Sequence, residues 1–393
     1  MKSGKLTCVA ALIVLATVTS ALGSGTWYVD GVAGSDKNDC KSLETACKTI
    51  SHAMSLTSQG DSITVAAATY HENLTVPHTL NIVGSGAART ILDGGGVGSV
   101  ILSNQHGVTV SGVTLRNGGG DGGNGVGDGG NVYNCFASMT ITDSILTGGR
   151  VRHGPGFDGF GGAIYNCPSS SMTIINTTIS ENSAEEGGGI CNGGTLTIIN
   201  STFSGNIARH HKGGGIRNYG YLTLTNSTIS GNRASGVGGG IHNGGLFGPS
   251  GSVVINNSTI SQNGGVHGGG IFSAKLGTRV RLRNTIIANN AGEDCHGTMI
   301  SDGYNLSSDD SCEFNSRGDL ITPEPGLGTL RNNGGPTQTM ALLPGSPAID
   351  SGNPDGCTDG RGHLLTTDQR GLPRPDAEDA GGCDRGAYED QKD

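Results

Sequence analysis

Five residues in the middle of the chain have side chains that could act together on an acidic sugar: Glu186, His211, Lys212, Arg217 and His242. A polysaccharide lyase needs a base to remove the proton beside a uronate carboxylate, and a cation to neutralise that carboxylate. Lys212 or His211 would be the base, and Arg217 would neutralise the carboxylate. The simpler interpretation is that these residues are solvated loop charges beside ordinary outward-facing residues, and the sequence favours it.

Aromatic and acidic residues indicate two further kinds of site. Tyr165, Tyr219 and Tyr221 could form a strip on which sugar rings stack. The Gly- and Asp-rich segment 121–130 is similar to a calcium-binding repeat, but such a site needs tandem turns, and an inserted loop also explains one copy. No pair of neighbouring Asp residues matches the two carboxylates of a glycosidase. We therefore expect no cofactor and no metal site, with calcium at segment 121–130 as the alternative.

Two sequence blocks recur and determine how these residues are positioned. The first, G-G-[GA]-I-x-[NS], occupies residues 161–166, 187–192, 213–218, 238–243 and 268–273. The second, N-[ST]-T-[IF]-S-x-N, occupies residues 176–182, 200–206, 226–232 and 257–263. The Ile residues of four successive first blocks, Ile164, Ile190, Ile216 and Ile241, follow at steps of 26, 26 and 25 residues. Between the blocks, apolar and polar residues alternate with the period of a strand.

This repeat predicts an all-β fold, a single-stranded right-handed parallel β-helix of about ten coils. One unit of about 26 residues cannot bury its own apolar face, whereas stacked units can. Each inward Ile or Leu would then rest on its equivalent one coil away, at about 4.8 Å. Inward Asn side chains would stack in the same way, and Gly would supply positive φ at the corners. The outward stripe beside the inward Ile positions reads Tyr133, Tyr165, Cys191, Arg217, His242 and Phe272.

The first 23 residues are typical of a secretory signal. Lys2 and Lys5 precede an apolar run from Cys8 to Val18, which is too short to span a membrane. We predict no other membrane span, and we place the protein outside the cell or at its surface.

The cysteines then fall in a compartment that permits disulfides. Three expected pairs, Cys40 with Cys47, Cys295 with Cys312, and Cys357 with Cys383, close loops outside the regular repeats. A fourth pair, Cys135 with Cys167, is expected because these residues occupy equivalent positions in neighbouring coils. Cys191 remains as an outward-facing, inert thiol. The sequence alone does not determine this connectivity.

The formal net charge is −9, which argues against binding to nucleic acid. Cations, neutral sugars or proteins are more natural ligands for such a chain. We expect a monomer whose partner is a polysaccharide or a cell-surface protein.

Segments at both ends resemble a known family. Residues 27–30, 47–50 and 60–63 resemble the N-terminal cap and first coil of secreted bacterial proteins of the pectin-lyase-like β-helix superfamily, and the coils resemble their predicted-outer-membrane-protein type repeats. Residues 332–339, 343–350, 367–371 and 386–389 resemble the choice-of-anchor Q module, which closes such helices. The resemblance implies fold and export rather than one activity.

The resulting domain organisation has four parts. We predict a signal peptide over residues 1–23 and an N-terminal cap over 24–60, with a short helix from Thr45 to Met54. The β-helix would span 61–292, and an irregular, disulfide-stapled capping module 293–393. We expect a non-enzymatic, adhesin-like protein that binds glycans or partner proteins along its rigid face, and the alternative is a polysaccharide lyase acting on an acidic polysaccharide.

Overall fold

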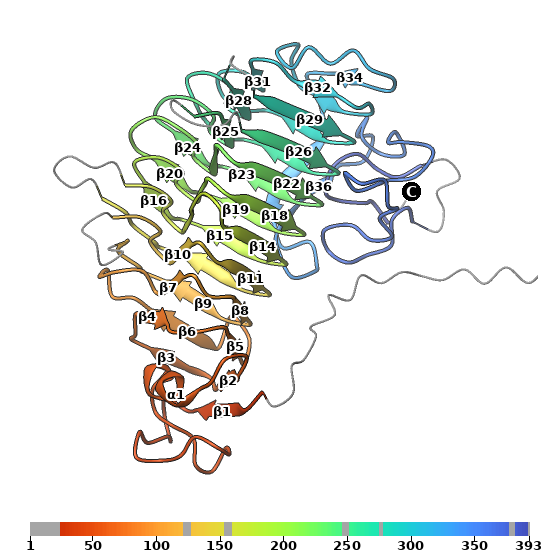
Figure 1. Ribbon diagram of the computed structural model, residues 1–393. Coiled ribbons are helices and arrows are strands. Elements are labelled where there is room, and N and C mark those ends of the chain that lie inside the picture. The colour runs from red at the N-terminus through yellow and green to blue at the C-terminus, as the bar shows by residue number, and fades with distance from the viewer. Residues whose placement is uncertain are drawn as a thin grey trace, which may run out of the picture.

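The computed structural model is a parallel β-solenoid, shown in Figure 1, and it describes residues 24–120, 127–152, 159–245, 251–274, 278–376 and 382–391. It makes about eight turns, slightly fewer than the ten coils expected. The predicted signal peptide lies outside the described residues. Three long parallel sheets, which we call A, B and C, form its walls.

The strands alternate between the sheets in chain order. Sheet A consists of β1 (Thr26–Val29), β2 (Ser62–Val65), β5 (Leu80–Gly84), β8 (Val108–Ser111), β11 (Ser138–Thr142), β14 (Ser171–Ile175), β18 (Thr195–Ile199), β22 (Tyr221–Thr225), β26 (Ser252–Asn256), β29 (Arg279–Arg283) and β32 (Ile300–Ser301). Sheet B consists of β3 (Ala68–Tyr70), β6 (Thr90–Asp93), β9 (Thr114–Arg116), β12 (Ile145–Thr147), β15 (Thr178–Ser180), β19 (Thr202–Ser204), β23 (Thr228–Ser230), β27 (Thr259–Ser261), β30 (Ile286–Ala288), β33 (Leu306–Ser307) and β34 (Leu320–Ile321).

Sheet C is the third wall, and a fourth, short sheet lies between B and C in chain order. Sheet C consists of β4 (Leu74–Val76), β7 (Ile101–Asn104), β10 (Val132–Cys135), β13 (Ile164–Asn166), β17 (Ile190–Asn192), β21 (Ile216–Asn218), β25 (Ile241–Asn243), β28 (Ile271–Ser273) and β31 (Cys295–His296). The short sheet consists of β16 (Ser183–Ala184), β20 (Ile207–Ala208) and β24 (Arg233–Ala234).

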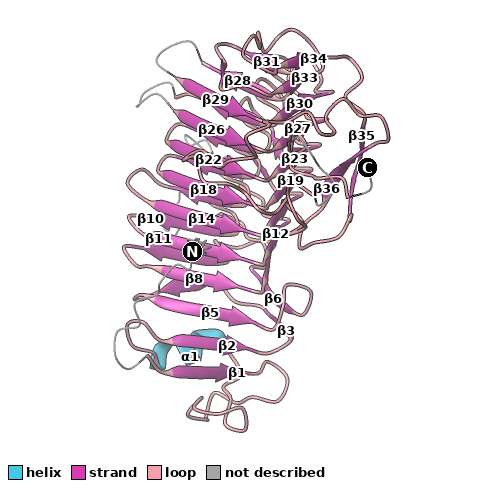
Figure 2. Ribbon diagram, turned by 90° about the vertical axis from the view of Figure 1, so that its right-hand side faces the viewer, coloured by secondary structure: helices cyan, strands magenta, loops and turns pink. Residues whose placement is uncertain are grey.

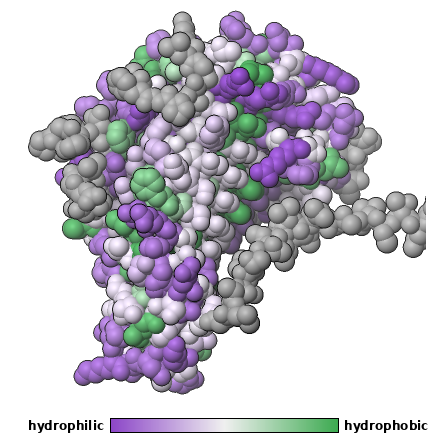
Figure 3. Space-filling view, in the orientation of Figure 1, coloured by the Kyte–Doolittle hydropathy of each residue, from purple (hydrophilic) through white to green (hydrophobic). Residues whose placement is uncertain are grey.

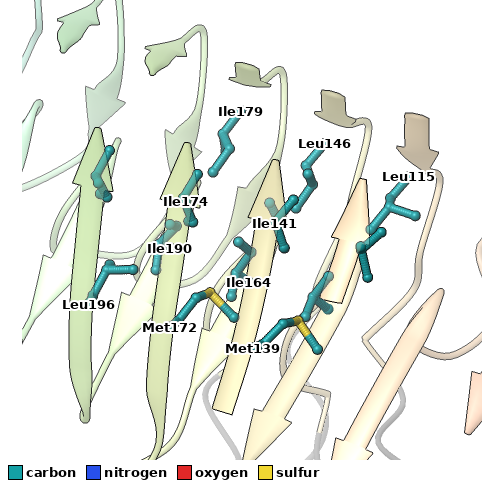
Figure 4. Close-up of a cluster of buried hydrophobic side chains, with 14 of the residues drawn as sticks. Leu115, Met139, Ile141, Leu146, Ile164, Met172, Ile174, Ile179, Ile190 and Leu196 are labelled. Carbon is teal, nitrogen blue, oxygen red and sulfur yellow. The ribbon is translucent and has the colours of Figure 1, made fainter. Parts of the chain in front are cut away.

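The core is built from equivalent apolar side chains stacked coil upon coil. Ile164 pairs with Ile190, and Ile190 with Ile216, in the register that the repeat predicts. These side chains are fully buried. Figure 4 shows the same stacking from other strands: one row contains Leu115, Leu146 and Ile179, and another contains Met139, Met172 and Leu196. The predicted stacking of inward residues is therefore confirmed.

Buried Asn side chains form two ladders, which confirms the predicted Asn stacking. In the first, at the end of sheet C, each side-chain Nδ2 donates to the next Oδ1 at 2.7–2.8 Å, through Asn134, Asn166, Asn192, Asn218 and Asn243. The second ladder follows sheet B and connects Asn182, Asn206, Asn232, Asn263 and Asn290 at 2.8–3.0 Å. Since a buried amide without partners is costly, these ladders hold the coils in one register.

A short helix, α1 (Ile50–Leu56), packs beside the first strands, as Figure 2 shows. It begins five residues later than the predicted Thr45, because Thr49 adopts an extended backbone and its side chain caps the helix by accepting from the His52 N–H. Cys47, within the predicted span, instead forms a β-bridge with Val29. It is the one helix in the described residues, and none there is long and apolar enough to cross a membrane.

All four predicted disulfides are present, between Cys40 and Cys47, Cys135 and Cys167, Cys295 and Cys312, and Cys357 and Cys383. Among the cysteines that the structure describes, Cys191 is the free one, as expected. Its register with Tyr165 is also confirmed.

Past residue 292 the parallel pairing continues through β31, β32, β33 and β34. The remaining tail contains one antiparallel pair, β35 (Leu327–Arg331) with β36 (Thr339–Leu342). Figures 1 and 2 show this tail along the side of the solenoid. Its Gln369 bridges two outward Thr residues of sheet B: Nε2 donates to Thr202 Oγ1 at 2.8 Å, and Oε1 accepts from Thr228 Oγ1 at 2.6 Å. The outward face of sheet B is therefore covered at these strands.

Candidate functional site

Side chains along a strand point alternately to its two faces, so the residue after each inward apolar residue of sheet C points away from the core. These outward residues, which we call the outward ladder, are Tyr133, Tyr165, Cys191, Arg217, His242, Phe272 and His296, in continuous register. A second row runs beside it, just before the Gly-Gly corners. Isolated backbone β-bridges connect its members in two series. One runs from Asp128 through Phe160 to Glu186, and the other from Lys212 through Val237 to His267. The two rows together contain most of the residues predicted to do chemistry.

The structure brings Glu186, Lys212 and Arg217 together in one charged cluster. Arg217 forms a close ion pair with the Glu186 carboxylate, and Lys212 Nζ lies 3.9 Å from the other oxygen. Glu186 is buried, and the Arg217 side chain is only 11% exposed. The Arg217 guanidinium also lies over two rings, 5.1 Å from that of Phe160 and 5.5 Å from that of Tyr219. The cation assigned to neutralise a uronate is thus engaged by the protein itself.

The two predicted histidines have different surroundings. His211 is exposed, and its ring meets the edge of the His210 ring at 6.0 Å. His242 is buried and stacks on Phe272 with ring centroids 5.3 Å apart. Burial, together with the charges of Lys212 and Arg217, lowers the pKa of His242 to about 3. His242 is therefore a neutral imidazole at physiological pH, held inside the ladder.

Tyr165 and Tyr219 lie together, whereas Tyr221 lies elsewhere. The hydroxyls of Tyr165 and Tyr219 are 3.2 Å apart, and the Tyr165 ring is 5.8 Å from that of Tyr133. Burial raises the pKa of Tyr165 to about 12. Tyr221 begins β22 in sheet A, where its side chain is 66% exposed. The three tyrosines therefore do not form the predicted sugar-stacking strip, because the chain turns a corner between Tyr219 and Tyr221.

Asp128 is a member of the site that the sequence analysis missed. It is buried, its Oδ1 accepts from the Phe160 N–H at 2.9 Å, and burial raises its pKa to about 6. Its position in the repeat could have identified it. Asp128 directly precedes Gly129-Gly130, just as Phe160 and Glu186 directly precede the Gly-Gly pairs of later coils. The acidic end of the predicted calcium segment thus belongs to the second row, while residues 121–126 of that segment lie outside the described residues.

Cys191 points away from the core and is nevertheless fully buried. Burial raises the pKa of its thiol to about 12, and the nearby Arg217 only partly offsets this. We expect a thiol reagent at pH 8 to leave the folded chain from residue 24 onward unlabelled, and to label one thiol after denaturation without reductant. Rapid stoichiometric labelling of the native protein would contradict this burial.

Cationic side chains gather beside the outward ladder, along the short sheet. Arg150, Arg209 and Arg233 are exposed, and Lys212 is half-buried; we call these four residues the cationic strip. The backbone of Arg150 forms a β-bridge with Ser183. The Ser183 hydroxyl accepts a hydrogen bond from Arg209 Nη2 at 2.7 Å. Arg233 follows two coils beyond Ser183. The negative net charge of the chain concealed this local concentration of cations, because residues far apart in the sequence create it.

Comparisons with known proteins find similarity to solved structures alone. No protein-family model and no curated protein matches the sequence, so the resemblance of the tail to the choice-of-anchor Q module stays a prediction. Among solved structures, the chain is similar to pectate lyase Pel9A, with 14% identity and a TM-score of 0.46, over 93% of this chain and 96% of that chain. It is similar to the XylC complex with xylose at 9% identity and a TM-score of 0.46, over 93% and 98% of the two chains. The GH136 lacto-N-biosidase from Eubacterium ramulus gives 12% identity and a TM-score of 0.46, over 72% of this chain and 60% of that chain. At these values the likeness carries no argument about activity.

Proposed function

We propose that the protein is an extracellular, non-enzymatic binder of acidic polysaccharide, and that the cationic strip and the adjoining outward ladder form the binding face. One observation carries this proposal. In the described residues 182–192, 206–218 and 232–243, the exposed Arg and Lys side chains are Arg209 and Arg233, while the acidic Glu185 and Glu186 are buried. The exposed Arg and Lys charges within these segments are not matched by exposed carboxylates there, although the whole chain is negative and the exposed Glu181 directly precedes the first segment.

The spacing of these cations suits a polymer. The register from Arg150 through Ser183 and Ile207 to Arg233 covers three coil steps, which is about 14 Å along the solenoid. Arg150 and Arg233 stand at the two ends of this register and Arg209 reaches Ser183 between them, so a polyanion lying along the solenoid can meet a cation at more than one coil. Arginine is well suited to this task because its guanidinium donates two parallel hydrogen bonds to a carboxylate.

The rest of the face supports binding to sugars over docking of a large apolar partner. Tyrosine hydroxyls at Tyr165 and Tyr219 lie beside the charges and can exchange hydrogen bonds with sugar hydroxyls. Figure 3 shows the side of the molecule seen in Figure 1, where pale residues fill the middle of the visible surface, purple hydrophilic residues flank them, and green hydrophobic residues form separate spots. The four disulfides fit an oxidising, extracellular compartment.

Replacing Arg209 and Arg233 together by Gln is expected to weaken binding to polygalacturonate or alginate about fivefold to thirtyfold at low salt. Two exposed ion pairs are together worth about 1–2 kcal/mol, which corresponds to such a factor. Isothermal titration calorimetry of the purified chain measures the effect. Affinity should also fall as salt is raised, because exposed charges are screened.

The matched control replaces Arg279 and Arg361, two exposed arginines outside the strip, by Gln. It should bind as the unaltered protein does, and a neutral dextran should bind to none of the three proteins. Equal losses in both double variants, or no binding of either acidic polymer, would refute the proposal. Growth of the ultraviolet absorbance of unsaturated uronate ends would refute it in another way, by showing a lyase.

A further inference from the structure

Three side chains at the last coils of the outward ladder converge on one point. His267 precedes β28, Glu293 precedes β31, and His296 ends β31, so neighbouring coils supply the group. Glu293 Oε1 lies 2.8 Å from His296 Nδ1 and 3.5 Å from His267 Nδ1. Each residue offers a ligand atom within 4.8 Å of the other two.

We propose that His267, Glu293 and His296 bind one zinc ion and leave its fourth position open to water. Two imidazole nitrogens and one carboxylate oxygen are a protein ligand set typical of open zinc sites. Calcium and magnesium favour oxygen ligands throughout, so this donor set selects against both. The side chains of His267, Glu293 and His296 are 57%, 28% and 37% exposed, which leaves their ligand atoms accessible from solvent.

The fold holds these ligands in place through neighbouring groups. The His296 ring stacks on Phe272 with centroids 5.0 Å apart and an interplanar angle of 5°, and Phe272 in turn stacks on His242. The Gly268 N–H donates to Glu293 Oε1 at 3.3 Å. Supporting contacts of this kind orient metal ligands before the ion arrives and so reduce the entropy lost on binding.

The charge of the cluster also suits a cation. In the described part of the chain, Glu293 forms its ion pairs with His267 and His296, and no Lys or Arg pairs with it. Its carboxylate is thus not already neutralised by a permanent charge, in contrast to Glu186. The other group of possible ligands among the described residues, Cys40, Cys47 and His52, has both sulfurs in a disulfide and is not available.

Zinc titration of the full chain, stripped with a chelator and followed by calorimetry, tests the proposal. We expect one ion per chain, and at least about a 100-fold loss of affinity in H267A, E293Q and H296A. The matched control is H363A, because His363 lies 3.0 Å from Asp359 in a pair that lacks a second imidazole. H363A should bind zinc as the unaltered chain does.

A second readout is the visible spectrum of cobalt(II), which replaces zinc and reports four-coordinate geometry. The band should appear with the unaltered chain and H363A and be absent from the three ligand variants, with unchanged circular dichroism showing that each variant folds. Absence of zinc binding, or binding that the three substitutions leave unchanged, would overturn the site. This outcome is independent of polymer binding, which the arginine variants test separately.

Discussion

Replacing Arg374 by Met is expected to lower the free energy of unfolding by about 3–5 kcal/mol, because it leaves a buried carboxylate without its partner. Arg374 Nε donates to Glu389 Oε2 at 2.6 Å, and both side chains are fully buried. Arg374 Nη1 also donates to Asn226 Oδ1 at 3.0 Å, which ties the tail to the corner between sheets A and B. Denaturant unfolding at pH 7 measures the loss, and limited proteolysis reports whether the tail detaches first.

This effect should depend on pH in a defined direction. Burial raises the pKa of Glu389, and the positive charge of Arg374 opposes that rise. Without Arg374 the folded-state pKa rises further above the unfolded value, so the variant loses more stability than the unaltered protein as the pH rises towards 7. This loss shrinks as the pH falls and the carboxyl protonates. The destabilisation of R374M should therefore be smaller at pH 5 than at pH 7.

The control for this prediction is an exposed pair of the same type. Arg281 and Asp302 form an ion pair at 2.6 Å with side chains that are 51% and 32% exposed. Arg281→Met should cost no more than about 1 kcal/mol, because solvent screens such a pair. A loss from R374M as small as that from R281M would show that this buried pair does not hold the tail.

Replacing Asn206 by Ala is expected to cost about 3–5 kcal/mol, because it breaks the ladder along sheet B. Asn206 Nδ2 donates to Ile179 O at 2.9 Å and to Asn232 Oδ1 at 2.8 Å. Its Oδ1 accepts from both the backbone N–H and the Nδ2 of Asn182, at 3.1 and 3.0 Å. Removing the amide leaves several buried groups without partners, each at a cost of about 1–3 kcal/mol. Thermal or denaturant unfolding measures the loss.

Asn315→Ala is the matched control, since Asn315 is exposed. It should change stability by less than about 0.5 kcal/mol. A loss below about 1 kcal/mol in N206A would mean that water takes over the partners of the missing amide. In that case the ladders would contribute little to the register of the coils.

The repeat itself determined the coil architecture before any tertiary information. Apolar residues at fixed steps must face inward on a parallel β-helix, so the stacking of Ile164 on Ile190 and the Asn ladders follow from local sequence. The Cys135–Cys167 disulfide follows as well, because equivalent positions of adjacent coils lie one strand spacing apart. These features depend on side-chain direction, which periodicity encodes.

The tertiary structure decided what covers each outward face, since periodicity carries no information about it. Cys191 was predicted outward, and it is fully buried beside Arg217, its partner in the next coil. His211 and Lys212 are adjacent in sequence, and only Lys212 reaches Glu186, because the corner segment before Ile216 turns His211 towards solvent. The tail crosses sheet B through Gln369, more than 160 residues after Thr202. Such long-range packing depends on complementary surfaces rather than on local period, and this is why the face left open, with its cationic strip, became visible only in three dimensions.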